Sequence, residues 1–143
     1  MQEDTRWPPG TCGGDSLAGV PTWLGYLWTL PNTAIGVLLG AFTLQLPRLA
    51  AGGVLVFDRA PRGITWLMPR LNRVAVTVGF VIVAARPVTG GLEMHERAHV
   101  AQFAAWGPLF LPVYLLLAVP FGYRRHPMEV AARRAAGERI SGR

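Results

Sequence analysis

The chain has 143 residues, a length typical of one domain. All 14 of its basic residues are arginine, and against 8 acidic residues they give a formal net charge of +6. The absence of lysine excludes a Schiff base and a P-loop. Charged residues make up only 15% of the chain and hydrophobic residues 51%, which excludes a disordered charged protein and raises the question of membrane contact. Cys12 is the only cysteine, so the chain has neither an intramolecular disulfide nor a Cys-ligated zinc site.

The N-terminal third divides into a polar part and an apolar part. Residues 1–21 are rich in Pro and Gly, which predicts a flexible tail, and their acidic start lacks the positive charge of a signal peptide. Residues 22–48 are predicted to be an apolar helical segment, and residues 23–46 carry no charge, a length that can cross a bilayer. Pro31 suits a first helical turn, so we expect the continuous helix to begin there. Three placements stay open: transmembrane, interfacial, or packed on a core.

The sequence then becomes rich in β-branched residues. Residues 53–59 form a short run of this kind and residues 74–86 a longer one, in which Gly79 suits a bulge. Residues 63–71 fit either a strand or a helical stripe. We therefore expect a small β-sheet of two or three strands.

Helical patterns follow the β-rich part. Residues 92–106 predict a helix that ends at Gly107-Pro108, and a last helix begins at Pro127. Residues 107–123 between them are uncharged and are interrupted by three prolines, and residues 137–143 are a basic tail. The predicted fold class is α+β, in which an apolar N-terminal helix precedes a small sheet and two further helices.

The predicted helix 92–106 contains an H-E-x-x-H pattern, His95-Glu96-Arg97-Ala98-His99. Histidines four residues apart lie about 40° apart around a helix, so both imidazoles can bind one tetrahedral metal ion. Glu96 lies on the neighbouring flank, where it can deprotonate a metal-bound water. The pattern predicts a metal site with His95 and His99 as ligands and Glu96 as catalytic base. The alternative is a surface helix that carries these residues by chance.

A catalytic zinc site needs a third protein ligand. Glu129 is a candidate, because it lies near the start of the last predicted helix, in which Pro127 can occupy the first position. His126 is the alternative ligand, although a residue just before such a proline more often caps the helix.

The motif and a distant helical glutamate together resemble the gluzincin branch of the zincin metallopeptidases. HERAHVAQFAAWGPLFLPVYLLL and YRRHPMEVAA are more closely similar to small uncharacterised bacterial zincin-like proteins, over about residues 30–135. The resemblance implies a zincin-like domain at residues 52–136, in which His95, His99 and Glu129 bind Zn²⁺ and Glu96 is the base. It further implies a metallopeptidase-like hydrolase with a peptide or protein substrate, and it identifies no particular substrate.

Two features depart from that family pattern. Glu93 and Arg97 are charged where zincin helices usually are not, but both lie on the back of the helix, where an i, i+4 pair stabilises it by a few tenths of a kcal/mol. Arg133 stands one turn after Glu129, where some gluzincins place an aspartate that orients a histidine ligand. Another group must then orient that histidine, for example a backbone carbonyl.

Other polar residues are candidates for the surroundings of the metal. Gln102 lies on the metal-facing side one turn past His99, where it can contact substrate or a bound water, or simply line the rim of a cleft. Tyr123 and Tyr114 can donate to developing negative charge, or they are ordinary core residues.

Convergence of the three ligands would exclude a single membrane crossing by residues 107–123 and leave a re-entrant or surface-packed loop. If residues 23–46 cross the bilayer, the arginines that follow them place the metal site in the cytoplasm. The predicted location is therefore membrane-associated, with a cytoplasmic protein as the alternative. No nucleic-acid partner is expected, because the arginines are not interleaved with aromatic residues in one patch. The oligomeric state stays open.

Three hypotheses for the function follow from these patterns. The preferred one is a zinc-dependent hydrolase of the metallopeptidase type. The main alternative is a non-catalytic membrane-associated protein in which the metal is structural or absent. The third is a small integral membrane protein with an accidental motif, which predicts that Glu129 lies far from the two histidines.

Overall fold

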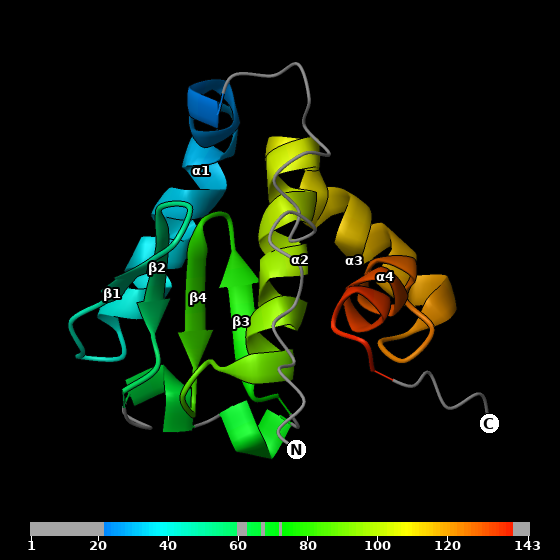
Figure 1. The fold of residues 1–143 in the computed structure, drawn as a ribbon. Helices are drawn as coiled ribbons and strands as arrows, with labels where there is room; N and C mark the ends of the chain where they lie inside the picture. The colour runs from blue at the N-terminus through cyan, green and yellow to red at the C-terminus, as the bar shows by residue number, and fades with distance from the viewer. Residues whose placement is uncertain (1–21, 60–62, 67, 72, 139–143) are drawn as a thin grey trace, which may run out of the picture.

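A four-stranded mixed sheet with helices on both faces forms the centre of the fold (Figure 1). The computed structural model describes residues 22–59, 63–66, 68–71 and 73–138. The predicted N-terminal tail at 1–21 and residues 139–143 of the predicted basic tail lie outside the described residues. The expected α+β class is confirmed.

The sheet has more strands than the two or three expected. Its strands are β1 (Arg48–Ala50), β2 (Val54–Phe57), β3 (Ala75–Val78) and β4 (Val81–Ala84). Their order is β1-β2-β4-β3, with β2 and β4 parallel and the other pairs antiparallel. Gly79, at φ 62°, begins the turn between β3 and β4, so the bulge expected there is wrong. The left-handed conformation that glycine tolerates closes a hairpin at this position.

The described residues of the segment 63–71 form neither a strand nor an α-helix. They contain two short 3₁₀ helices, η1 (Gly63–Trp66) and η2 (Met68–Leu71). Met68 of η2 packs with Phe57 and Val81 of the sheet, so this segment closes one end of the core.

Helix α1 (Thr22–Ala41) passes through Pro31, so the expectation that the helix begins at that proline is wrong. A proline inside a helix removes one hydrogen bond and costs about 3 kcal/mol. Packing along the sheet offsets this cost. Gly36 lies against Val81 and Gly40 against the ring of Phe57, and an added Cβ atom at either glycine would clash.

The two faces of the sheet bury separate clusters. Val56 and Ile82 pack with Val100 of α2 (Gly90–Trp106) on one face. Phe57 and Val81 pack with Leu39 of α1 on the other. Strand alternation therefore places α1 and α2 on opposite faces of the sheet.

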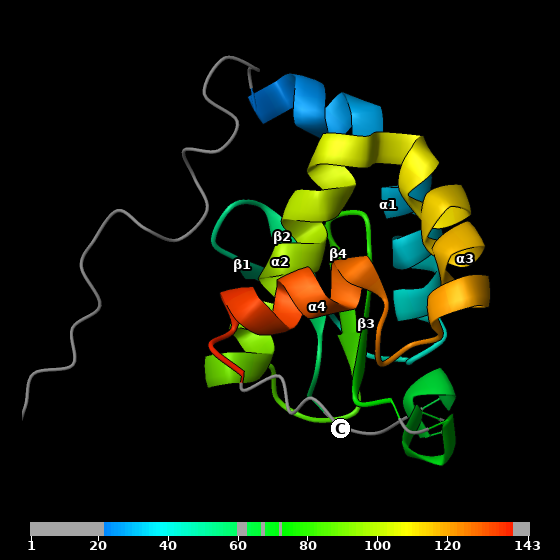
Figure 2. The ribbon, with the colours of Figure 1, turned by 90° about the vertical axis from the view of Figure 1, so that its right-hand side faces the viewer.

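The C-terminal half is helical and folds back on α2 (Figure 2). Helix α2 ends at Gly107 as expected, in a left-handed conformation at φ 54°. It is followed by η3 (Gly107–Leu109), α3 (Phe110–Phe121) and α4 (Pro127–Ala135), which begins at the expected proline. The loop expected for residues 107–123 is thus mostly helix.

The helical run Gly90–Phe121 is, within the described residues, the one stretch long and apolar enough to cross a membrane by length and composition. It bends at Gly107, and the chain after α3 returns α4 to the side of α2 (Figure 2). Because of this reversal the run is not a straight membrane span.

Candidate metal centre

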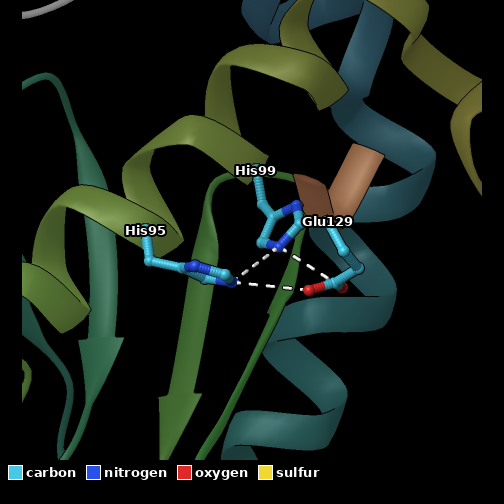
Figure 3. Close-up of side chains that lie close together, drawn as sticks. All are labelled: His95, His99 and Glu129. Atoms are coloured by element: carbon cyan, nitrogen blue, oxygen red, sulfur yellow. Dashed lines mark hydrogen bonds and ion pairs between the residues drawn. The ribbon is translucent and has the colours of Figure 1, made fainter. Parts of the chain in front are cut away.

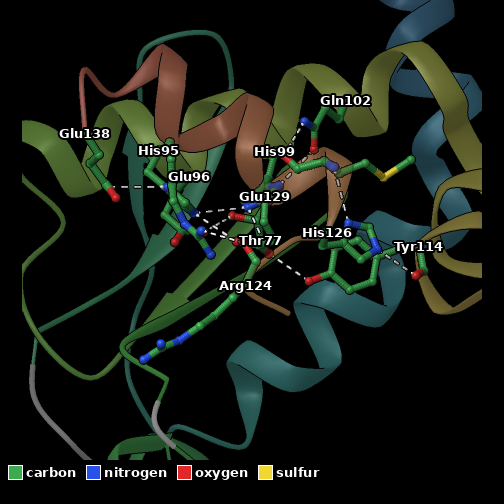
Figure 4. Close-up of polar contacts among 12 residues, drawn as sticks. Thr77, His95, Glu96, His99, Gln102, Tyr114, Arg124, His126, Glu129 and Glu138 are labelled. Carbon is green, nitrogen blue, oxygen red and sulfur yellow. Dashed lines mark hydrogen bonds and ion pairs between the residues drawn. The ribbon is translucent and has the colours of Figure 1, made fainter. Parts of the chain in front are cut away.

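The H-E-x-x-H residues lie on the buried face of α2. The buried positions of this helix share one stripe, because they recur at helical spacing: His95, Glu96, His99, Val100 and Phe103. The apolar members pack into the core, while the three polar members face α4 and the β3 side of the sheet (Figure 4).

Helix α4 brings Glu129 to the two histidines (Figure 3). The Nε2 atoms of His95 and His99 are 3.2 Å apart. Oε2 of Glu129 lies 3.6 Å from Nε2 of His95, and Oε1 lies 3.5 Å from Nε2 of His99. All three residues are buried, and one ligand atom from each lies within 4.8 Å of the others. The hypothesis of an accidental motif predicted that Glu129 lies far from the histidines, and this prediction is wrong.

These spacings fit a tetrahedral metal ion. Metal–ligand bonds of 2.0–2.1 Å at tetrahedral angles place ligand atoms about 3.3–3.4 Å apart. The distance between the two Nε2 atoms is close to that value, and each Nε2 atom lies 3.5–3.6 Å from a different oxygen of the Glu129 carboxylate. Oε2 of Glu129 is also buried without a hydrogen-bond partner among the described residues, as expected for an atom reserved for a ligand. The donor set therefore could hold a metal ion.

His126 fixes the start of α4 instead of binding with the other three. Its Nδ1 accepts a hydrogen bond from the backbone N–H of Met128, and its Nε2 donates to the carbonyl of Tyr114. The imidazole is fully buried and stacks on the Tyr114 ring at 4.0 Å. Both ring nitrogens are occupied, so the alternative of His126 as third ligand is not supported.

Gln102 sets the protonation of His99. Its side-chain amide donates to the carbonyl of Met128 at 3.0 Å, which turns its Oε1 toward Nδ1 of His99 at 2.9 Å. Because Oε1 can only accept, Nδ1 carries a proton, and Nε2, which faces Glu129 and His95, is the nitrogen that could bind a metal ion. Gln102 thus prepares His99 as a ligand.

Glu138 lies beside the other histidine. Nδ1 of His95 is buried without a hydrogen-bond partner among the described residues, and Oε1 of Glu138 lies 3.5 Å from it. A carboxylate near the outer nitrogen of a ligand histidine typically orients the ring. Arg133, which departs from the family pattern, does not do this: it donates to the carbonyl of Arg124.

Glu96 is held by the sheet. The Thr77 hydroxyl in β3 donates a 2.6 Å hydrogen bond to Oε2 of Glu96, and the carboxylate is buried. Its negative charge is close enough to His99 to help raise the pKa of that imidazole. Glu96 therefore stands next to the three converging side chains without being one of them (Figure 4).

The charge of Glu129 is stabilised within the cluster. Burial alone would raise the pKa of Glu129, but hydrogen bonds with His95, His99 and Tyr114 outweigh burial and hold the pKa well below its usual range. Tyr114 donates to Oε1 at 2.7 Å, and burial with this contact raises the pKa of the phenol. Glu129 is therefore ionised and Tyr114 neutral at pH 7.

Tyr123 lies at the outer side of the cluster. The Cζ atom of Arg73 lies 3.6 Å from the centroid of the Tyr123 ring, and that of Arg133 lies 5.5 Å from it. Burial and the nearby charge of Glu129 raise the pKa of its hydroxyl. Tyr123 as a whole residue is 41% exposed, so this side of the cluster borders solvent.

The predicted pair on the back of α2 is present. Nε of Arg97 lies 3.0 Å from Oε1 of Glu93, and the guanidinium also donates to the carbonyl of Ala51 between β1 and β2. The back of α2 is therefore anchored to the sheet by the pair that departs from the family pattern.

Two neighbours of the centre, Thr77 and Glu138, were not among the residues singled out from the sequence. Thr77 is one polar residue inside an apolar strand, and Glu138 is one acid beside an arginine-rich tail.

Comparisons with known proteins return no match: no family model, no curated protein and no solved structure matches the chain. The functional argument therefore rests on the geometry of the centre.

Proposed function

We propose that the protein is a zinc-dependent hydrolase of the metallopeptidase type, with His95, His99 and Glu129 as ligands of one Zn²⁺. The observation that carries this proposal is the convergence of the two imidazole Nε2 atoms and the Glu129 carboxylate beside a separate buried carboxylate, Glu96. A site whose carboxylates were all metal ligands would lack a free base. Here one acid completes the donor set and the other stays available.

The proposed chemistry divides between the metal and the chain. Zn²⁺, when bound, would supply Lewis acidity that acidifies water and polarises a carbonyl group. Glu96 accepts the proton from the attacking water and passes it to the leaving amine. Thr77 holds Oε2 of this carboxylate, so Oε1 is the oxygen that takes the proton. Tyr123, whose phenol is neutral, would donate a hydrogen bond to the substrate oxygen.

The position of β3 favours a peptide substrate. This strand is at the edge of the sheet and pairs only with β4 among the described strands. An edge strand can align an extended peptide through main-chain hydrogen bonds. Thr77 of the same strand contacts Glu96, so a peptide along β3 would pass next to the proposed base.

Glu96→Gln tests this proposal. The variant keeps the shape and the contact with Thr77 but removes the base, so we expect hydrolysis of a quenched-fluorescent peptide library to fall by about 10²-fold or more, with zinc content unchanged. Glu93→Gln is the matched control, because it neutralises an acid on the opposite side of the same helix, and it should retain activity.

Two results would contradict the enzyme proposal. Zinc-loaded wild-type protein that cleaves no member of the library would favour a structural metal. Equal activity of Glu96→Gln and wild type would remove Glu96 from the chemistry.

A further inference from the structure

Helix α1 is polar inside and apolar outside. Its buried positions are small or polar residues: Gly25, Thr29, Asn32, Gly36 and Gly40, with Thr43 just beyond the helix. Its large apolar side chains point outward instead, as shown by Trp23 at 62% and Leu38 at 62% exposed. A helix in water buries its large apolar residues, whereas helices in contact with lipid pack through small residues.

Helix α3 is also apolar on its exposed side. Phe110 is its buried residue, and its ring lies 4.0 Å from the ring of Phe103 of α2 in a tilted arrangement. Leu116 and Val119 on the other side are 71% and 86% exposed. No charged residue occurs from position 98 to position 123, so the outer surface of α3 is as apolar as that of α1.

Helix α3 and the C-terminal half of α1 lie on one side of the molecule, at the right in Figure 2 and behind the sheet in Figure 1. We call the exposed sides of α1 and α3 the apolar face. Such an extended exposed patch marks an interaction site in most proteins.

Arginines collect at the end of the apolar face where α1 and α3 both end. Arg124 and Arg125 follow α3 directly, and Arg73 stacks on the adjoining Tyr123. Arg70 lies in η2, which packs near α1 because Met68 of η2 and Leu39 of α1 belong to one cluster. Arg59 is also close to the end of α1, because its backbone N–H donates to the side-chain oxygen of Gln45. None of these arginines belongs to a salt bridge with another described residue.

We infer that the apolar face docks on the surface of an anionic lipid bilayer, with these arginines against the headgroups. Lipid satisfies both halves of the surface, because acyl chains cover the exposed leucines and valines while anionic headgroups neutralise the arginines. A second copy of the chain would not neutralise these arginines, since each described acidic side chain already contacts another group: Asp58, Glu93, Glu96, Glu129 and Glu138.

The face lies along the membrane and does not cross it. Gly36 and Gly40 of α1 pack directly on β4 and β2, so a crossing by α1 would carry the edge strands of the sheet into hydrocarbon. Open sheet edges are not tolerated there. Docking to a depth of roughly 5–10 Å immerses the outer side chains and leaves the sheet in water.

Vesicle binding of the full-length chain tests this inference independently of metal and activity. We expect the protein to co-sediment with vesicles of phosphatidylcholine and phosphatidylglycerol, and more weakly with phosphatidylcholine alone. Leu38→Glu combined with Val119→Glu places one charge on each helix of the face and should weaken binding at least about tenfold. Both side chains are exposed, so the variant should keep its circular dichroism spectrum.

Two controls separate the contributions. Ala131→Glu adds one such charge at an exposed position of α4, away from the apolar face, and should bind as wild type does. Arg124→Gln with Arg125→Gln should lower binding to the anionic vesicles by about fivefold per charge removed, with little effect on phosphatidylcholine vesicles.

Three results would overturn the inference. Wild-type protein that binds neither vesicle would do so, as would equal binding by the Leu38→Glu, Val119→Glu variant. A lipid-free dimer that this variant dissociates, seen by analytical ultracentrifugation without vesicle binding, would assign the face to a second copy.

Discussion

The hydroxyl of Thr77 in β3 donates a 2.6 Å hydrogen bond to Oε2 of Glu96 in α2. This contact joins the edge strand of the sheet to the helix that carries both histidines. It also makes the two oxygens of Glu96 inequivalent, because one is fixed as an acceptor from Thr77. The proposed base therefore has a defined orientation before any substrate binds.

Thr77→Val should lower kcat by about tenfold and leave KM and zinc content nearly unchanged. Valine keeps the volume and the strand preference of threonine but removes the hydrogen bond, which is worth roughly 1–1.5 kcal/mol in orienting the carboxylate. Thr77→Ser keeps the hydroxyl and should restore most of the activity. Steady-state kinetics on a cleaved peptide measure the effect, and an unchanged kcat in Thr77→Val would show that Glu96 needs no support from β3.

Glu138→Gln should weaken zinc binding by about tenfold or more. Oε1 of Glu138 lies 3.5 Å from the buried Nδ1 of His95, and partners of this kind typically change metal affinity by about 10–100-fold. Competition with a chelating dye measures the affinity. Glu93→Gln removes the same charge from the outer side of α2 and serves as control; equal affinities for the two variants would mean that Glu138 does not orient His95.

Asp58→Ala should destabilise the fold by about 2–3 kcal/mol. Oδ2 of Asp58 accepts from Arg48 at 3.0 Å and from the backbone N–H of Val88 at 2.8 Å, so this carboxylate joins β1, β2 and the segment before α2. Removing it leaves two donors without their acceptor. Urea unfolding measures the change. A loss below about 0.5 kcal/mol, the usual range for surface substitutions, would contradict this role.

The same carboxylate predicts how stability depends on pH. Burial by itself would raise the pKa of Asp58, but the contacts with Arg48 and Val88 outweigh burial, so the pKa lies below its usual value in the folded chain. The stabilisation is therefore complete above the pKa of an unfolded aspartate, about 3.9, and is lost as the pH falls from there through the lowered folded value. Unfolding of wild type and Asp58→Asn at a series of pH values should show their difference shrinking below about pH 4. A difference that grows in acid would have the wrong sign.

Local signals in the sequence predicted the parts of the fold that depend on local chemistry. Both ends of α2 were predicted to within about two residues and the start of α4 was predicted at its observed position, because Gly107 ends one helix and Pro127 begins the other. Prolines misled elsewhere: α1 passes through Pro31 because the sheet supports it, and Pro120 lies inside α3. The packing of α1 on the sheet is not visible in the local sequence.

The candidate centre shows the same division. Helical spacing predicted that His95 and His99 share a face, and the structure brings Glu129 to them from α4. Thr77 and Glu138 reach the centre from 19 residues before Glu96 and from beyond α4, respectively. Contacts between distant segments depend on how the sheet and helices pack, and no spacing rule predicts them.

The most direct test of the central claim is the zinc content of the purified chain after loading and desalting, measured by elemental analysis. We expect about one zinc ion per wild-type chain, the capacity of a single tetrahedral site. The His95→Ala, His99→Ala double variant should retain almost none while keeping its circular dichroism spectrum. Wild-type protein free of zinc, or a double variant that holds as much zinc as wild type, would contradict a metal centre formed by His95, His99 and Glu129.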